Sequence, residues 1–456
     1  MLAMKTQNLT LDDRRLAVRS ATHRDEAAAV DDLLDMLNFS SGARKRISRR
    51  AEALVDAARQ QSHRQGSLDA FLQEFGLSNK EGVALMCLAE ALLRVPDADT
   101  ADKLIAEKIA SGEWSDHRGR SDSVFVNAST WALMLTGRVV ELDRETRQDI
   151  GGWFGKLVNR LGEPVIRAAV MQAMRIMGNQ FVLGRTIDEG LKRAEKINPP
   201  HVRNSFDMLG EGARTMADAR RYFQSYMQAI EAIGKATPGD SVATRHGISV
   251  KLSALHPRYE YKARDRVMTE LLPDLLALAR AAKDYNLGFN IDAEEARRLD
   301  ISLDLFAALA EAPELAGWDG LGLVVQAYQK RAPFVIDWLV ALARQTGRRF
   351  MTRLVKGAYW DSEIKHAQER GLGDYPVYTR KATTDLSYLV CAEKLMAARD
   401  VIYPQFATHN AHTVAAVLEM AGDTDGFEFQ RLHGMGELLY DRLETVAGRA
   451  YPVRVY

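Results

Sequence analysis

From about residue 205 onward, the chain alternates between short apolar runs, often rich in β-branched residues, and longer segments with helical periodicity. Eight such runs occur, at residues 205–211, 247–255, 287–295, 321–328, 350–360, 402–410, 427–435 and 451–456. Seven helix candidates separate them, at residues 216–234, 266–285, 301–312, 333–347, 384–400, 412–422 and 437–448. This order and length predict an α/β fold, a TIM-like (βα)8 barrel. An open doubly wound sheet is the alternative, but its dinucleotide-binding form needs a glycine fingerprint that we do not find.

The first 200 residues have almost entirely helical periodicity. We therefore predict an N-terminal arm at residues 1–25, an all-helical region at 26–200 and the barrel at 201–456. The last strand candidate ends at the last residue, Tyr456. A closed barrel normally has one more helix, so we expect the barrel to be C-terminally incomplete and the native chain to continue.

Charge and composition argue against several classes of protein. Lys and Arg number 61 and Asp and Glu number 61, so the net charge is zero and we expect no nucleic-acid partner. No apolar stretch approaches the ~20 residues that cross a bilayer, and the N-terminus has no signal-peptide core. Cys87 and Cys391 each lie in an apolar helical pattern and are interpreted as core thiols. These features predict a cytoplasmic protein.

Polar side chains collect at the ends of the strand candidates, where barrel enzymes place their chemistry. Any one of them can be read as a helix cap or a loop hydrogen bond. Charged groups inside barrel strands are harder to explain in that way, and the sequence has Lys251, Asp292 and Arg353. Burying a charge without a partner is costly. Together they predict either a mutual ion-pair network or a site for a charged ligand.

Several short motifs do not match their chemistry. The segment Gly234–Ser241 resembles a phosphate loop, but Asp240 stands where the lysine is required. The sequence GMGELL (434–439) has Leu439 in place of the third glycine of a dinucleotide fingerprint. His409 and His412 are close in sequence but have no third ligand nearby, so we predict no metal site.

Longer segments carry a more specific signal. They read NIDAEEARRLDISLDLF (290–306), GLVVQAYQKRAPFVIDWL (322–339), RLVKGAYWDSEIKHAQERGLGDYPVYTRKATTDLSYL (353–389), YPQFATHNAHTVAAV (403–417) and FEFQRLHGMGE (427–437). These segments resemble the proline dehydrogenase domain of the bifunctional flavoproteins called proline utilization A. The resemblance covers nearly all of residues 205–456 and extends to MRIMGNQFVLGRTIDEGLKRA (174–194).

The resemblance implies a barrel that holds FAD noncovalently at the carboxyl ends of its strands. Such enzymes oxidise L-proline to Δ1-pyrroline-5-carboxylate, the first step of proline catabolism to glutamate. A hydride passes to flavin N5, and the electrons then pass to a membrane quinone such as ubiquinone. This implies a cytoplasmic enzyme that can associate peripherally with the inner membrane.

The resemblance also implies which residues line the FAD. Arg353 matches the cation beside N5, where negative charge develops, and Lys356 matches a phosphate or ribityl contact. Gln326 matches a contact to the pyrimidine edge. The other matching positions are Asp292, Val325, Tyr328, Gly357, Ala358, Tyr359, Trp360, Thr379, Lys381, Thr384, Thr408, His409, Asn410, Gln430 and Leu432. For the Thr and Asn members, helix capping is the competing interpretation.

The implied substrate pocket must accept a zwitterion. By resemblance, Lys251 supplies the cation for the carboxylate, while Tyr359, Leu432 and Tyr456 shape the ring pocket. Asp292 would pair with the basic groups and orient Tyr456. The expected catalytic set is Lys251, Asp292, Arg353, Tyr359 and Tyr456.

Glu211 matches an acidic residue that positions an arginine of the family's final barrel helix. That helix also carries an adjacent arginine pair that clamps the substrate carboxylate, and it would follow Tyr456. We therefore expect the chain as given to bind proline poorly, and FAD as well.

The resemblance further implies an NAD-dependent aldehyde dehydrogenase domain later in the native chain. The oligomeric state is left open. Two other hypotheses remain: an unrelated barrel aldolase or lyase in which Lys251 forms a Schiff base, and a non-enzymatic scaffold whose helical half serves assembly.

Overall fold

The structure is a computed structural model that describes residues 9–37, 39–62, 182–199, 202–208, 210, 212–237 and 239–456. Residues 1–58 and 186–456 form one compact unit, and residues 59–185 form a second. Our domain limits at residues 25 and 200 stay a prediction, but the first 58 residues group with the barrel.

Eight parallel strands close into a barrel in chain order, which confirms the predicted fold class. Each predicted run overlaps one strand. The strands are β1 (Arg203–Asp207), β2 (Gly247–Val250), β3 (Gly288–Ile291), β4 (Leu321–Gln326), β5 (Phe350–Val355), β6 (Ile402–Ala407), β7 (Glu428–Arg431) and β8 (Val453–Val455). Strand β1 begins two residues before its run. Pairing of Arg203 with Arg454 and of Asn204 with Val455 joins β1 to β8 and closes the barrel.

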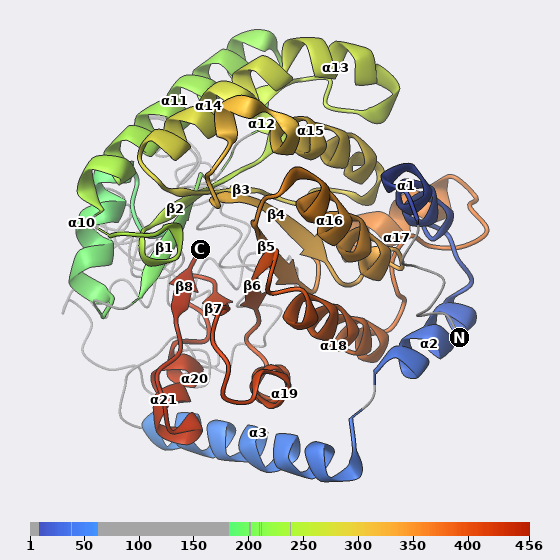
Figure 1. Cartoon of the computed structure of the whole chain (residues 1–456), viewed down its shortest axis with the longest axis vertical. Helices are drawn as coiled ribbons and strands as arrows, with labels where there is room; N and C mark the ends of the chain where they lie inside the picture. Colours follow the sequence, from blue (N-terminus) through green and yellow to red (C-terminus); the bar gives the residue numbers. More distant parts are fainter. Residues whose placement is uncertain are drawn as a thin grey trace, which may run out of the picture. The chain divides into compact units, whose positions relative to one another are not determined.

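Helices surround the strands, as Figure 1 shows. Those at the predicted positions are α11 (Met216–Ala236), α13 (Arg264–Glu270), α14 (Leu272–Asp284), α15 (Leu299–Glu311), α16 (Ala332–Thr346), α18 (Lys381–Ala397), α19 (Ala411–Ala421), α20 (Glu437–Asp441) and α21 (Leu443–Ala447). Two predicted helices are therefore each split in two. Three more were not predicted as separate elements: α10 (Ile187–Ile197), α12 (Leu252–Leu255) and α17 (Trp360–Glu369). No helix in the described ranges is both long enough and apolar enough to cross a membrane.

Three N-terminal helices pack on the outside of the barrel: α1 (Leu11–Ser20), α2 (Glu26–Met36) and α3 (Ser41–Ser62). Helix α1 lies beside α16, and α2 lies beside α18 (Figure 1). A capping box between Thr10 and Asp13 starts α1. The buried Arg15 of α1 stacks on the ring of Trp338, with its Cζ atom 5.4 Å from the ring centroid. The described part of the predicted N-terminal arm, residues 9–25, thus contains helix α1, which packs on the barrel.

The barrel interior is polar, whereas its outer layer is apolar. Side chains alternate between the two faces of a strand. Phe289 and Ile291 of β3 belong to the main hydrophobic core, while Asn290 between them donates a hydrogen bond to Gln405 of β6 (3.3 Å). Interior side chains from different strands therefore hydrogen-bond to one another, as buried polar groups generally do. Within the described ranges, Asn290 Oδ1 and Thr352 Oγ1 are buried exceptions without a partner.

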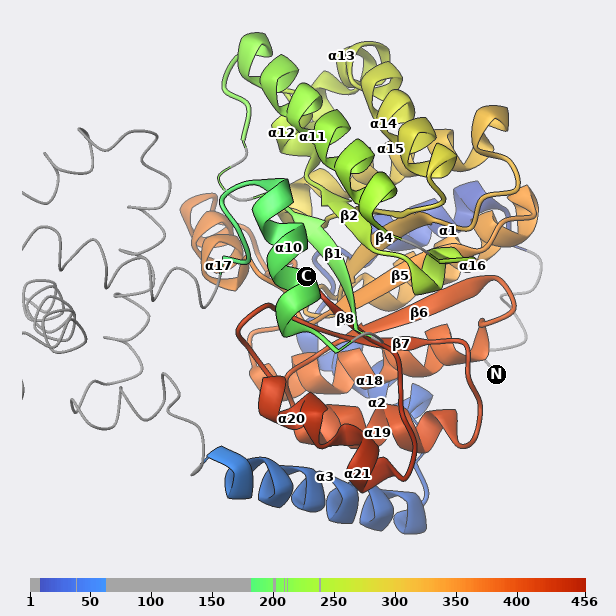
Figure 2. The ribbon, with the colours of Figure 1, turned by 90° about the vertical axis from the view of Figure 1, so that its left-hand side faces the viewer.

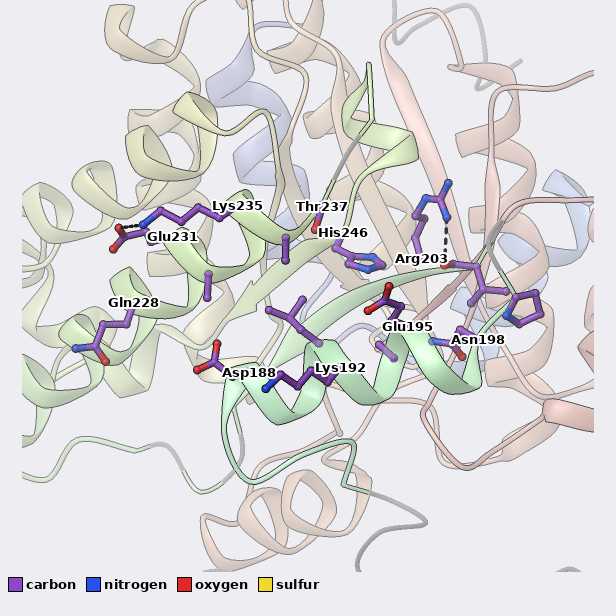
Figure 3. Close-up of a pocket in the computed structure, with 16 residues that line it drawn as sticks. Asp188, Lys192, Glu195, Asn198, Arg203, Gln228, Glu231, Lys235, Thr237 and His246 are labelled. Atoms are coloured by element: carbon purple, nitrogen blue, oxygen red, sulfur yellow. Dashed lines mark hydrogen bonds and ion pairs between the residues drawn. The ribbon is translucent and has the colours of Figure 1, made fainter.

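A hollow of about 1030 Å³ lies between α10 and α11, over the start of β1. Figure 2 shows α10 in front of β1, and Figure 3 shows the residues that line the hollow. Arg203 and His246, at the amino ends of β1 and β2, form part of this lining. Because barrel enzymes place their chemistry at the carboxyl ends of the strands, this hollow is at the structural end of the barrel.

Burial lowers the pKa of His246 to about 4, and the charges of Arg454 and Arg203 add to this effect. The imidazole Nδ1 accepts a hydrogen bond from the backbone N–H of Asn204 (3.0 Å), so it carries no proton there. His246 is therefore a neutral structural group at neutral pH.

Gly322 of β4 has no room for a side chain. An added Cβ would lie 1.8 Å from Asn290 Oδ1 and 2.9 Å from the Met351 carbonyl oxygen. We expect Gly322→Ala to destabilise the fold by about 1–3 kcal/mol, measured by denaturant unfolding. Gly373 has open space around its Cβ position, so Gly373→Ala is the control. Equal stability of the two variants would contradict the tight interior packing.

The neutral state of His246 predicts a pH dependence of stability. Between pH 6.5 and 4, the unfolded chain binds a proton that the folded chain does not. The contribution of neutral His246 to the free energy of unfolding should therefore be fully present above pH 6.5. It should fall by about 1–3 kcal/mol as the pH drops toward 4. Chemical denaturation of His246→Gln across this range should show a weaker dependence than the parent. The exposed His412→Gln serves as control, and parallel curves for all three proteins would disprove the assignment.

Candidate active site

The charged and phenolic side chains expected to be catalytic meet at the carboxyl ends of the strands. Lys251 directly follows β2, Asp292 follows β3, Arg353 lies on β5 and Tyr456 follows β8. The carboxyl ends of parallel strands share one end of a barrel. The structure therefore brings residues that are up to 205 positions apart into one cluster.

Lys251 lies between two carboxylates. Its Nζ atom is 2.9 Å from both carboxylate oxygens of Asp207 and 3.2 Å from Asp292 Oδ2. We missed Asp207 because we expected the strand to end at Glu211, the last residue of the run 205–211. In the structure β1 ends at Asp207. The signal was an acidic residue inside a strand candidate. Glu211 lies outside the described residues.

Arg353 is almost completely buried, with 2% of its surface exposed, and its donors are used on every side. Nε donates to Gln430 Oε1 (2.7 Å), and Nη1 donates to Asp292 Oδ1 (3.1 Å). Nη2 donates to the hydroxyls of Ser205 (3.1 Å) and Ser249 (3.0 Å). Asp292 therefore joins the guanidinium of Arg353 to the ammonium of Lys251.

Two tyrosines border this charged cluster. The Cζ atom of Arg353 lies 4.4 Å from the ring centroid of Tyr456, a cation–π contact. Burial raises the pKa of Tyr456, and the charge of Arg353 partly opposes this rise. Burial also raises the pKa of Tyr359 to about 12. Both phenols are thus neutral at physiological pH and keep a proton to donate.

Gln326, at the end of β4, uses both ends of its amide to join two loops. Its Nε2 donates to the Glu294 carbonyl oxygen (2.9 Å), and its Oε1 accepts from the Ala358 backbone N–H (3.1 Å). Its neighbour Val325 is buried. In this arrangement the Gln326 side chain orders the loops after β3 and β5.

A glycine is required at position 357 because the loops after β4 and β5 approach each other closely there. Its φ is +145°, and an added Cβ would lie 2.4 Å from the ring of Tyr328. The Tyr328 backbone N–H donates to the Lys356 carbonyl oxygen (2.7 Å), so the loops after β4 and β5 are hydrogen-bonded side by side.

Two of the lysines expected to contact the cofactor share one partner. Lys356 pairs with Asp385 of α18, and Lys381 lies 2.6 Å from the same carboxylate. Both contacts lower the pKa of Asp385, although burial acts against them. Two cations and one anion leave a net positive charge here.

The N-terminal helix α2 reaches this side of the site. Glu26 accepts hydrogen bonds from the backbone N–H (3.0 Å) and the hydroxyl (3.1 Å) of Thr379. One residue earlier, the Tyr378 carbonyl oxygen accepts from Trp360 Nε1 (2.9 Å). The Trp360 side chain is left 41% exposed.

The residues after β6 have local structural roles in the structure. Asn410 caps α19 by accepting from the Thr413 N–H (2.9 Å), and Thr408 accepts from the Asn410 N–H (3.1 Å). His409 Nε2 accepts from the Leu432 N–H (3.0 Å), and burial and Arg431 lower its pKa. Capping is thus seen for Asn410, whereas Thr384 is buried inside α18.

The geometry disfavours the alternative chemistries. Schiff-base formation needs a neutral amine, whereas two carboxylates beside Lys251 stabilise its charged form. Burial raises the pKa of Cys391 to about 12, which makes its thiol a poor nucleophile; Cys87 lies outside the described ranges. Within those ranges, no group of three or more His, Cys, Asp or Glu residues is placed to hold a metal ion.

Comparison with known families agrees with this geometry. The family model "Proline dehydrogenase" matches residues 190–456, which is more than half of the chain. "Proline utilization A proline dehydrogenase N-terminal domain" matches residues 12–59. "DNA-binding domain of Proline dehydrogenase" matches residues 67–181. That description runs against our expectation of no nucleic-acid partner. Acidic residues outnumber basic ones in the segment, which lies outside the described residues.

Individual relatives support the same family. "Bifunctional protein PutA" of Klebsiella aerogenes is 53% identical over all of this chain and 35% of its own length, and that of Salmonella typhimurium is 54% identical over 97% and 34%. A solved mutant of Bradyrhizobium japonicum PutA has a TM-score of 0.72 and 53% identity, over 95% of this chain and 43% of that one. The chain spans about a third of the length of these curated relatives. It belongs to the proline dehydrogenase family, in the form found in proline utilization A proteins.

Proposed function

We propose that this chain carries out the FAD-dependent oxidation of L-proline to Δ1-pyrroline-5-carboxylate, the first step of proline catabolism to glutamate. The observation that supports it most is the linked cluster of Lys251, Asp292, Arg353 and Tyr456 at the carboxyl ends of the barrel strands. A buried arginine and a lysine at the same mouth suit an anionic cofactor and a carboxylate substrate.

The residues present fit a noncovalently bound FAD. The paired Lys356 and Lys381 keep a net positive charge that suits a pyrophosphate, and the partly exposed Trp360 offers a flat surface for a base. Arg353 would hold a fixed positive charge near the flavin ring. Bound FAD would supply the hydride acceptor, and a preorganised cation stabilises the negative charge that reduction creates.

On the substrate side, each residue has a role that its surroundings support. Lys251 can exchange one of its two carboxylate partners for the carboxylate of proline. Tyr359 and Tyr456 are neutral and would border the ring of proline, and Leu432, 38% exposed, would add an apolar wall. Asp292 holds Lys251 and Arg353 in fixed relation.

The partners of the reaction are part of the proposal. Electrons would pass to a membrane quinone such as ubiquinone, and the protein would be cytoplasmic with peripheral contact to the inner membrane. In a longer native chain, an NAD-dependent aldehyde dehydrogenase domain would oxidise the ring-opened product.

The absorbance spectrum tests the proposed function. Protein expressed from the full-length gene should show the bands of oxidised flavin, and anaerobic addition of L-proline should bleach them. L-alanine, which lacks the ring, is the control and should leave the bands intact. A flavin-loaded protein whose bands do not respond to L-proline would refute the proposal.

Lys251→Ala should separate substrate binding from flavin binding. Loss of a hydrogen bond to a charged group costs about 1.5–3 kcal/mol, so we expect KM for proline to rise tenfold or more. Flavin content should change little. Lys235→Ala is the matched control, because Lys235 pairs with Glu231 on an exposed face of α11, away from the carboxyl ends of the strands. If Lys251→Ala lost flavin and proline binding equally, Lys251 would be a structural residue.

A further inference from the structure

The barrel interior contains a chain of hydrogen bonds that leads from the end opposite the active site to Arg353. Its central members are Glu428 and Gln430, two residues apart on β7 and therefore on the same face of the strand. Their side chains are 1% and 0% exposed, respectively. Glu428 is not among the residues expected to contact the substrate.

Gln430 has one amide orientation that satisfies both of its neighbours. Its Oε1 accepts from Arg353 Nε (2.7 Å), and its Nε2 donates to Glu428 Oε1 (2.7 Å). A flipped amide would point its NH2 group at the Arg353 N–H and its carbonyl oxygen at the carboxylate. Both of these contacts are unfavourable, because donors would face donors and acceptors would face acceptors.

Glu428 can impose this choice because it is itself held as an acceptor. Its Oε1 accepts from Arg454 Nε (2.7 Å) and from Gln405 Nε2 (2.8 Å), in addition to Gln430. Its Oε2 accepts from Arg454 Nη2 (3.1 Å). The paired contact with Arg454 is the bidentate type, which fixes direction as well as charge.

The consequence reaches the active site through Arg353. The side-chain oxygen Oε1 of Gln430 accepts from Arg353 Nε, and Oδ1 of Asp292 accepts from Arg353 Nη1. These two contacts set the plane of the guanidinium. We propose that Glu428 is a positioning residue: by orienting the Gln430 amide, it holds the Arg353 guanidinium where it stabilises charge on the reduced cofactor. This inference rests on the proposed function.

The test measures the reduction potential of the bound flavin in Glu428→Gln. A glutamine at 428 can donate as well as accept, so the Gln430 amide would no longer be fixed. We expect reduction by L-proline to slow about tenfold, since a loss of ~1.4 kcal/mol has this effect. The flavin potential should become more negative by about 30 mV, the shift that matches a tenfold change for a two-electron couple.

Glu428→Gln also leaves Arg454 without its charge partner and can lower stability. The double variant Glu428→Gln/Arg454→Met removes both charges, and such replacements are often neutral for stability. The potential of this variant should stay low while its stability recovers. Val414→Ala would leave a cavity at the buried face of α19 and is the control for lost stability alone. It should leave the flavin potential unchanged.

Two outcomes would overturn the inference. One is a potential in Glu428→Gln that equals that of the parent. The other is a potential that recovers together with stability in the double variant, which would make the role of Glu428 structural only. Failure of the proposed function would look different, because the parent itself would then lack flavin or would not react with L-proline.

Discussion

The structure depends on the satisfaction of charged groups inside the barrel. A guanidinium buried without partners costs several kcal/mol, and the barrel contains two, Arg353 and Arg454. Arg353 is satisfied by side chains from other parts of the barrel, and Arg454 by the carboxylate of Glu428 together with backbone carbonyl oxygens. These contacts also constrain strand pairing, because a slip of one residue would turn the partners to the outer face. The groups suited to chemistry are thus among those that specify the barrel.

The N-terminal helices extend this interdependence to the outside of the barrel. Glu26 satisfies a backbone N–H in the loop before α18, and the Arg24 carbonyl oxygen accepts from the buried Lys330 (2.8 Å). Lys330 also pairs with Asp374 (2.7 Å), so one ammonium joins the N-terminal segment to two loops near the active site. The first 58 residues therefore belong physically to the barrel, although their periodicity alone resembles the helical stretch that follows them.

The fold was predictable because its signals are local. Each strand and helix leaves its own periodicity in the sequence, so all eight strands could be located and the barrel inferred. The ends of the strands were harder to predict from the sequence. The run 205–211 continues past the end of β1, so Asp207 was not recognised as a strand-end residue. The roles of Gln326 and Lys356 were also beyond local patterns, since their partners Glu294, Ala358 and Asp385 come from other loops or helices.

The sequence by itself determined that charged residues such as Lys251, Asp292 and Arg353 occur in or at the ends of strands, and that they therefore need partners. The tertiary structure decided which partners they have. Lys251 lies between Asp207 and Asp292, and Arg353 meets Gln430, whose amide is oriented by Glu428. These choices depend on the register and closure of eight strands, which place residues far apart in the chain within hydrogen-bonding distance. Periodicity along a chain reports which face a side chain occupies, whereas its neighbour on that face is set by packing between strands.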